Sequence, residues 1–246
     1  MSSIKGIIFD FGGTIDTNGI HWGEFIWEQY QKVGVDITRD IYREAYVYGE
    51  RFLAKNPIIE PTDTFHTMMR NILLRVNVIY SPQFPPRALS RLSEKKFNAE
   101  TAIAIADGCY NKVKETMKTT CTIVGKLAME YPLVLVTNFY GNMSVVLEEF
   151  NLSKYFKRIV ESSIVGLRKP DPALFALGVE ALGLNPKEIV VIGDSYRKDI
   201  YPSSTLGCKT VWLKNICWEE EDVIQGHEAT AVIHTLEDLP HIINQI

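Results

Sequence analysis

The sequence has few cysteines and no long apolar run. Four cysteines occur among 246 residues, and they include no CxxC pair, which argues against a zinc site. We expect four reduced, buried thiols and a reducing compartment. No apolar stretch approaches the roughly 18 residues of a membrane span. The first predicted strand begins so close to Met1 that no signal peptide is expected. These absences predict a cytoplasmic protein with no membrane association.

An excess of basic residues is also missing. The chain has 26 Lys and Arg against 30 Asp and Glu, which gives a net charge of −4 and a pI of about 5.8. Proteins that bind nucleic acids in general carry a basic face, so we expect no nucleic-acid partner. The hydrophobic content of 46% and the charged content of 23% are typical of a globular protein. The length allows one large domain or two smaller ones.

An apolar run near the N-terminus ends in a carboxylate and a glycine turn. The run Ile7–Phe9 is typical of a strand buried on both faces of a parallel sheet. Asp10 then lies at the carboxyl end of that strand, where open α/β sheets bind ligands. Gly12 and Gly13 allow a sharp turn that brings a backbone N–H close to a bound anion. Taken alone, the stretch is equally consistent with a simple Asx turn.

A helical region follows, and no strand is evident from about 18 to 100. Apolar residues at helical spacing, together with capping and stop signals, predict at least three helices there and a further helical stretch after a proline-rich break. We interpret 18–100 as an inserted all-helical cap domain. The expected helix starts are Trp22, Thr38 and Asp63, the break is 81–86, and the further stretch runs through Leu89, Leu92 and Phe97.

The remaining chain alternates strands with helices. A helix around 123–128 leads into the second apolar run, and Asp171-Pro172 is a strong helix start that ends at Gly183. This alternation predicts an α/β fold, a three-layer Rossmann-like parallel sheet formed by 1–17 and 101–246. The expected later strands are 133–136, 158–160, 189–192 and 209–213, with a sixth at 231–233.

Polar side chains follow three of these strands at the same edge of the sheet. Asp10, Thr137 and Asp194 each end a strand, Lys169 precedes a helix, and Asp199 comes five residues after Asp194. Alone, each has an ordinary explanation: a solvated lysine, a strand-end threonine, or an aspartate that caps a helix. Together and in this order they indicate a shared site for an anion and a metal.

These residue types suit phosphoryl transfer. The reaction needs a nucleophile, a cation that offsets the phosphate charge and hydrogen-bond donors around its oxygens. Asp10 can serve as a carboxylate nucleophile. Asp10, Asp194 and the backbone carbonyl of Gly12 are hard oxygen ligands that suit Mg²⁺. Thr137 can donate a hydroxyl hydrogen bond, and Lys169 supplies a compact positive charge.

The chain resembles the haloacid dehalogenase-like (HAD) hydrolase superfamily. The resemblance implies that Asp10 forms an aspartyl-phosphate, that Thr137 and Lys169 hold the phosphoryl group, and that Asp194 and Asp199 help to bind Mg²⁺. Gly13 and Asn138, within the matching segments, are expected to contact the substrate. The segments that carry the resemblance are Asp10-Phe11-Gly12-Gly13-Thr14, Thr137-Asn138, Lys169-Pro170-Asp171-Pro172 and Gly193-Asp194-Ser195 through Asp199.

One position departs from the pattern of the family. Phosphatases of the family usually carry a second aspartate, an acid and base, two residues after the nucleophile, and this chain has Gly12 there. Loss of a general acid–base group lowers rates by about 10²–10⁴-fold. His21 and Asp16, just beyond the motif, are candidates to replace it, although each is also an ordinary loop residue. Lys32 and Lys55 are cap lysines that a phosphonate hydrolase would need, but no pattern distinguishes either from a surface lysine.

The function we predict is that of a Mg²⁺-dependent hydrolase, a phosphatase of a small phosphorylated metabolite, with the helical domain as a lid. The alternatives are a dehalogenase or phosphonate hydrolase of the same superfamily, and a catalytically weak member that binds a phosphorylated ligand. The sequence indicates neither the substrate nor the oligomeric state.

Overall fold

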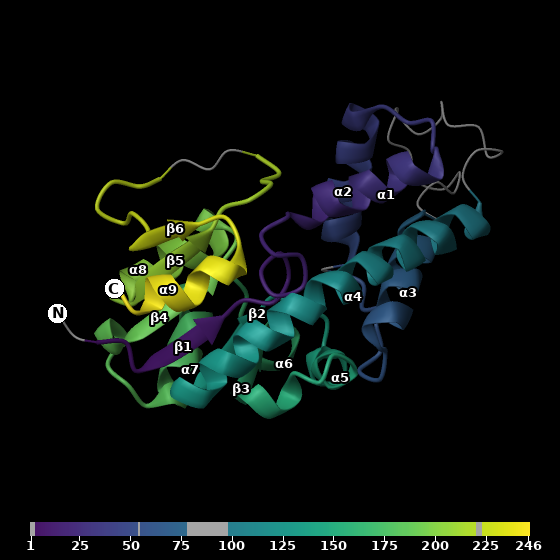
Figure 1. Cartoon of the computed structure of the whole chain (residues 1–246). Helices are drawn as coiled ribbons and strands as arrows, with labels where there is room; N and C mark the ends of the chain where they lie inside the picture. Colours follow the sequence, from purple (N-terminus) through teal and green to yellow (C-terminus); the bar gives the residue numbers. More distant parts are fainter. Residues whose placement is uncertain (1–2, 54, 78–97, 220–222) are drawn as a thin grey trace.

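The computed structural model describes residues 3–53, 55–77, 98–219 and 223–246. Six parallel strands form one sheet in the order β3-β2-β1-β4-β5-β6, with the first strand near the middle (Figure 1). This is the predicted α/β fold, and all six predicted strands are present. The strands are β1 Gly6–Phe9, β2 Leu133–Thr137, β3 Phe156–Glu161, β4 Ile189–Gly193, β5 Lys209–Leu213 and β6 Ala231–Ile233.

The sheet is covered on both faces, which explains why its central strands are apolar throughout. Successive side chains of β1 point to opposite faces, because a strand has a period of two residues. Ile7 and Phe9 pack into the large apolar cluster with α4 (Ala99–Glu130) and α9 (Leu239–Ile243), whereas Ile8 packs into a second cluster with Leu174 and Phe175 of α7 (Pro172–Leu182). The result is the three-layer arrangement that the alternating pattern predicts.

Three helices of the cap begin close to the predicted positions. They are α1 Trp22–Val33, α2 Arg39–Leu53 and α3 Phe65–Asn77. Gly34 ends α1 in the left-handed conformation, as its position indicates. The predicted start of α3 at Asp63 is early: the Thr64 hydroxyl accepts from the backbone N–H of Thr67, and Asp63 accepts from the N–H of Glu60.

One long helix joins the cap to the core. The sequence predicts a helix near 123–128, but α4 spans Ala99–Glu130, with its first turn capped by the Asn98 side chain. It packs against α1 and α3 and continues along the sheet (Figure 1). The expected domain boundary after residue 100 falls in its first turn, and that division stays a prediction. The expected break at 81–86 and helical stretch from Leu89 to Phe97 lie outside the described residues.

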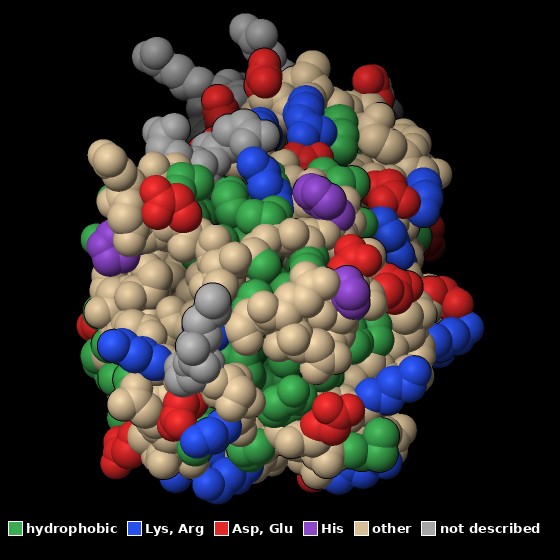
Figure 2. All heavy atoms as spheres, turned by 60° about the vertical axis from the view of Figure 1, so that its left-hand side comes forward, with side chains coloured by type: hydrophobic (Ala, Val, Ile, Leu, Met, Phe, Trp, Pro, Cys, Tyr) green, Lys and Arg blue, Asp and Glu red, His purple; other side chains and the backbone are tan. Residues whose placement is uncertain are grey.

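The remaining elements connect the strands. None of the described helices is long and apolar enough to span a membrane. On the face shown in Figure 2, acidic and basic side chains are interspersed. The connecting elements are α5 Met143–Glu149, η3 Ser153–Tyr155, α6 Ser162–Val165, α7 Pro172–Leu182, η4 Pro186–Glu188, η5 Tyr196–Ile200, α8 Tyr201–Thr205, η6 Leu236–Asp238 and α9 Leu239–Ile243.

Candidate active site at the carboxyl edge of the sheet

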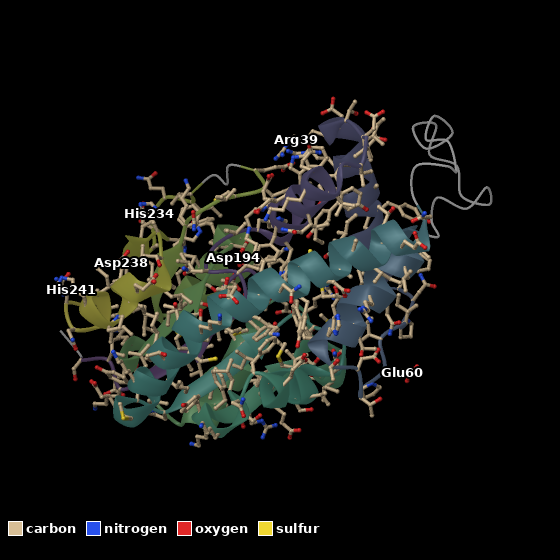
Figure 3. The ribbon with its side chains drawn as sticks, turned by 45° about the vertical axis from the view of Figure 1, so that its right-hand side comes forward. Arg39, Glu60, Asp194, His234, Asp238 and His241 are labelled. Atoms are coloured by element: carbon tan, nitrogen blue, oxygen red, sulfur yellow. The ribbon has the colours of Figure 1, made fainter. Side chains whose placement is uncertain are left out.

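Three aspartates meet at the carboxyl edge of the two central strands. Asp10 follows β1 and Asp194 follows β4, and the strands pair in parallel, with the Asp10 N–H donating to the Ile192 carbonyl at 2.9 Å. Asp199 lies in η5, just after β4. Carboxylate oxygens of all three lie within 4.8 Å of one another. In Figure 3, Asp194 lies where the core meets the cap. The structure thus brings together three of the predicted ligands.

Lys169 lies inside this group of carboxylates. Its Nζ lies 2.6 Å from Asp10 Oδ1 and 2.7 Å from Asp199 Oδ1, and its side chain is 2% exposed. Asn138 holds the backbone of Lys169 in place: its Oδ1 accepts from the Lys169 N–H at 2.9 Å, and its Nδ2 donates to the Lys169 carbonyl at 3.2 Å. Asn138 therefore positions the lysine, and its contact with a substrate stays a prediction.

The three carboxylates, two of them buried and Asp194 partly exposed, outnumber the ammonium group of Lys169. Burial raises the pKa of Asp10 to about 6, against the attraction of Lys169, and the charge of Asp199 adds to the rise. Burial and the charges of Asp199 and Asp10 raise the pKa of Asp194 well above its usual value. Burial alone would lower the pKa of Lys169, but Asp10 and Asp199 together raise it. One ammonium among three carboxylates leaves an excess of negative charge, so the donor set fits a divalent cation.

The Thr137 hydroxyl is a buried donor with no partner among the described residues. It lies at the end of β2 and is 1% exposed, and it lines the cavity above Asp10. Buried hydroxyls are normally hydrogen-bonded, so an orphan at this place is suited to a ligand oxygen. The neighbouring Thr14 hydroxyl is already used, since it donates to Asp10 Oδ2 at 3.1 Å.

The two glycines of the first motif have different surroundings. A Cβ at Gly13 would overlap the Asp194 carboxylate, and the φ of +92° also requires glycine. Its N–H donates to Asp16 Oδ1 at 2.7 Å, so donation to a substrate stays a prediction. A Cβ at Gly12 would meet only the Trp22 indole, at 3.8 Å from Nε1. There is therefore room for a side chain at position 12, where the family usually carries the acid.

The two candidate replacements for that acid are engaged elsewhere. Asp16 is fully buried and accepts hydrogen bonds from Gly13 and from Trp22 Nε1, and burial raises its pKa to about 8. His21 lines the cavity, but its Nδ1 accepts from the Gly23 N–H and caps α1. Burial, with Lys198 and Arg43 nearby, lowers the pKa of His21 to about 4. An acid–base role for either stays a hypothesis.

Two aromatic residues border the site, and sequence reasoning did not find the second. Trp22, one of the cap aromatics that the sequence offers for shaping a pocket, borders Gly12 and donates to Asp16. Trp218, in the segment after β5, stacks on His21 with ring centroids 5.5 Å apart and lines the cavity. Helical spacing could have placed Trp22 on a face, but no pattern in the sequence links residue 218 to the first motif.

A family model and several proteins of known function resemble this chain. The haloacid dehalogenase-like hydrolase model matches residues 4–201, and a HAD-hydrolase-like model matches 166–239. The glyceraldehyde 3-phosphate phosphatase of Pyrococcus furiosus is 31% identical over 94 residues, 38% of this chain and 39% of the relative. The phosphoglycolate phosphatase of Escherichia coli is 30% identical over 121 residues, 46% of this chain and 47% of the relative. The match thus spans less than half the length of these relatives.

Solved structures show the same fold over nearly the whole chain. The HAD phosphatase from Thermococcus onnurineus has a TM-score of 0.52 at 21% identity and covers 98% of both chains. YfnB from Bacillus subtilis, solved bound to magnesium, has a TM-score of 0.57 at 16% identity and covers 99% of this chain and 100% of its own. Because the first family model spans most of the sequence, this chain belongs to the haloacid dehalogenase-like hydrolase family.

Proposed function

We propose that the protein is a Mg²⁺-dependent phosphatase that hydrolyses a small phosphorylated metabolite through an aspartyl-phosphate on Asp10. The observation that carries the proposal is the group of Asp10, Asp194, Asp199 and Lys169, in which all but the partly exposed Asp194 are buried, with the unpaired hydroxyl of Thr137 in the same cavity. The two curated relatives named above are phosphatases, which supports the same reaction class.

The reaction then has two steps at Asp10. A carboxylate oxygen of Asp10 bonds to phosphorus while the ester P–O bond breaks and the alkoxide leaves, taking a proton from water. Water next attacks the phosphorus, releasing inorganic phosphate and restoring the Asp10 carboxylate. Thr137 donates to a phosphoryl oxygen, and Lys169 offsets its charge. Asp10, Asp194, Asp199 and the Gly12 carbonyl would hold Mg²⁺, which supplies positive charge that the excess of carboxylates calls for.

A phosphatase assay tests this proposal. We expect release of phosphate from p-nitrophenyl phosphate with Mg²⁺ and none after its removal by EDTA, because the carboxylates otherwise repel the anionic ester. Asp10→Asn should abolish release, since an amide is a poor nucleophile. The control is a thermal unfolding measurement, in which the Asn variant should unfold as cooperatively as the parent and so show that its fold is intact. Phosphate release by that variant at the parental rate would contradict the role of Asp10.

Gly12 favours a second candidate function, a weak member of the family that binds a phosphorylated ligand with little turnover. Without the acid, hydrolysis would be slower by about 10²–10⁴-fold than in a family member that has the second aspartate. Binding of inorganic phosphate with Mg²⁺, measured by calorimetry, combined with negligible hydrolysis, would support this second function. Dehalogenation remains a separate alternative, and chloride release from a haloacid without Mg²⁺ would identify it.

A further inference from the structure

A large cavity opens above Asp10, between the sheet and the cap. Its volume is about 1030 Å³, and Asp10, Thr137 and Lys169 are among the residues that line it. Sites that enclose drug-sized ligands measure roughly 300–1,000 Å³. Inorganic phosphate and a short alcohol would leave most of this cavity filled only with water. The volume therefore points to a substrate larger than the esters named for the two phosphatase relatives.

The part of the cavity wall that α1 and α3 supply is apolar, whereas α2 adds Tyr46 and Glu50. Within the apolar part, Trp22 and Ile72 are partly exposed and the other side chains are buried. The free energy falls when a ligand covers apolar surface that otherwise faces water. We call this surface the apolar wall: it consists of Trp22, Ile26, Phe65, Met68, Met69 and Ile72.

The wall begins beside the reacting centre. The Trp22 indole lies 3.8 Å from the place that a Cβ on Gly12 would take, and its N–H is already donated to Asp16 at 2.9 Å. It therefore presents ring surface and no free donor to a ligand. Of the charged residues of the lining outside the catalytic group, Asp16 is buried and already accepts from Gly13 and Trp22. The others are exposed: Glu50, Arg168, Arg197, Lys198 and Glu219. An alcohol bonded to phosphorus at Asp10 can therefore reach an apolar surface beside Gly12.

We propose that the preferred substrate is a phosphate monoester whose alcohol carries an extended apolar or aromatic group, which packs on the apolar wall while its phosphoryl group reaches Asp10. This inference rests on the phosphatase function proposed above and adds the class of leaving group. Trp22 and Ile72 are then specificity-determining residues, since they offer the accessible part of the wall.

A series of primary-alkyl phosphates tests the proposal, because their leaving alcohols have similar pKa values. The series is ethyl, butyl, 2-phenylethyl and 2-(2-naphthyl)ethyl phosphate, assayed with Mg²⁺. Each added methylene-sized group that packs on the wall should raise kcat/KM about fourfold, so packing of about three or four such groups would place the naphthylethyl ester at least about 10²-fold above the ethyl ester. A flat or falling series would overturn the inference. Hydrolysis of none of the esters would instead contradict the phosphatase function.

A matched pair of variants locates the effect. Ile72→Asn places an amide in the wall and should reduce the naphthylethyl-to-ethyl ratio of kcat/KM by about fivefold. Val33→Asn makes the same kind of change at the far end of α1, where Val33 is 40% exposed and does not line the cavity, and should keep the parental ratio. An unchanged ratio in Ile72→Asn would overturn the assignment.

A binding measurement on the unmodified protein covers the case in which the variant does not fold. Alkylphosphonates keep the phosphoryl charge but have no ester bond to break. We expect 2-phenylethylphosphonate with Mg²⁺ to inhibit with a Ki at least tenfold below that of ethylphosphonate. Equal Ki values would overturn the proposal.

Discussion

Thr137 carries a polar group that the fold itself leaves unused. Its hydroxyl is buried without a partner among the described residues, so it contributes nothing favourable to folding. Thr137→Val keeps the shape and removes the hydroxyl. We expect phosphatase activity to fall by about 10–10²-fold, since a hydrogen bond to a charged group contributes roughly 1.5–3 kcal/mol. The free energy of unfolding in urea should not decrease.

Thr137→Ser is the control, because it keeps the donor at the same position. It should retain most of the activity. A Val variant that keeps full activity but unfolds more easily would show that the hydroxyl has a structural role instead.

Gly12 is open to the side chain that the family usually carries there. An added Cβ meets only Trp22 at ordinary contact distance, and the backbone φ is not in the left-handed region. Gly12→Asp should therefore fold and supply the missing acid, raising kcat by up to about 10²–10⁴-fold. Gly12→Asn, which has the same size without an acid, should give no such gain. Equal rates for glycine and aspartate at this position would indicate that another group already transfers the proton.

The meeting of Asp10 and Asp194 could be predicted because each of them ends a strand. Asp10 and Asp194 follow apolar runs, and parallel strands place both at one edge, so their meeting follows from the pattern. Two sets of hydrogen bonds could not be predicted: those between the Asn138 side chain and the Lys169 backbone, and the one from Trp22 to Asp16. Each depends on where a turn places a side chain, which the pattern of apolar residues does not encode.

At the scale of the elements, α3 and α4 are joined by an ion pair whose effect depends on pH. Arg70 donates from Nε and Nη2 to Asp107 at 2.8 and 2.7 Å, and His66 Nε2 lies 2.7 Å from the same carboxylate. The hydrogen bond from Arg70, with that of His66, lowers the pKa of Asp107 to about 2 from 3.8. The charged form is therefore favoured in the folded state.

Because the folded pKa is the lower one, the pair stabilises the protein fully above pH about 4, and this effect is lost as the pH falls toward 2. Asp107→Asn should lower the Tm slightly at pH 7, since a pair this exposed contributes little. The difference from the parent should shrink at pH 3. A difference that stays constant between pH 7 and pH 3 would show that charge is not its cause.

Element types could be predicted more reliably than element lengths. The strands follow from uniform apolar runs, because both faces of the sheet are buried. Only the part of α4 near 123–128 is predicted from the sequence, although its buried residues recur at helical spacing from Ala102 to Leu127 and form one continuous face. That face packs against α1 and α3 in the cap and joins the large apolar cluster of the core.

At the scale of the whole molecule, the cap and the core share one apolar cluster. Phe65 at the start of α3 contacts Phe11 of the first motif, with ring centroids 6.4 Å apart, and Phe150 after α5 at 5.6 Å. Phe11 also packs against Phe139 beyond β2 at 5.8 Å. The aromatic contacts thus connect the cap with the first motif. A movement of α3 would therefore also displace Phe11, the residue next to Asp10.

A second contact between cap and core offers the sharpest test of their arrangement. Trp218, in the segment after β5, lies over Gly23 of α1, and the Arg43 guanidinium of α2 lies 4.5 Å from its ring centre. An added Cβ at Gly23 would overlap the Trp218 ring. Gly23→Ala should therefore destabilise the protein by about 1–3 kcal/mol from overpacking, although alanine in a helix normally stabilises by up to about 1 kcal/mol.

The double-mutant cycle separates these two effects. With Trp218→Ala in the background the overlap disappears, so Gly23→Ala should become neutral or stabilising in urea unfolding. The coupling between the two substitutions should then be at least about 1 kcal/mol. If Gly23→Ala stabilises the parent protein, Trp218 does not lie over α1 in solution, and the segment after β5 would not close this side of the cavity.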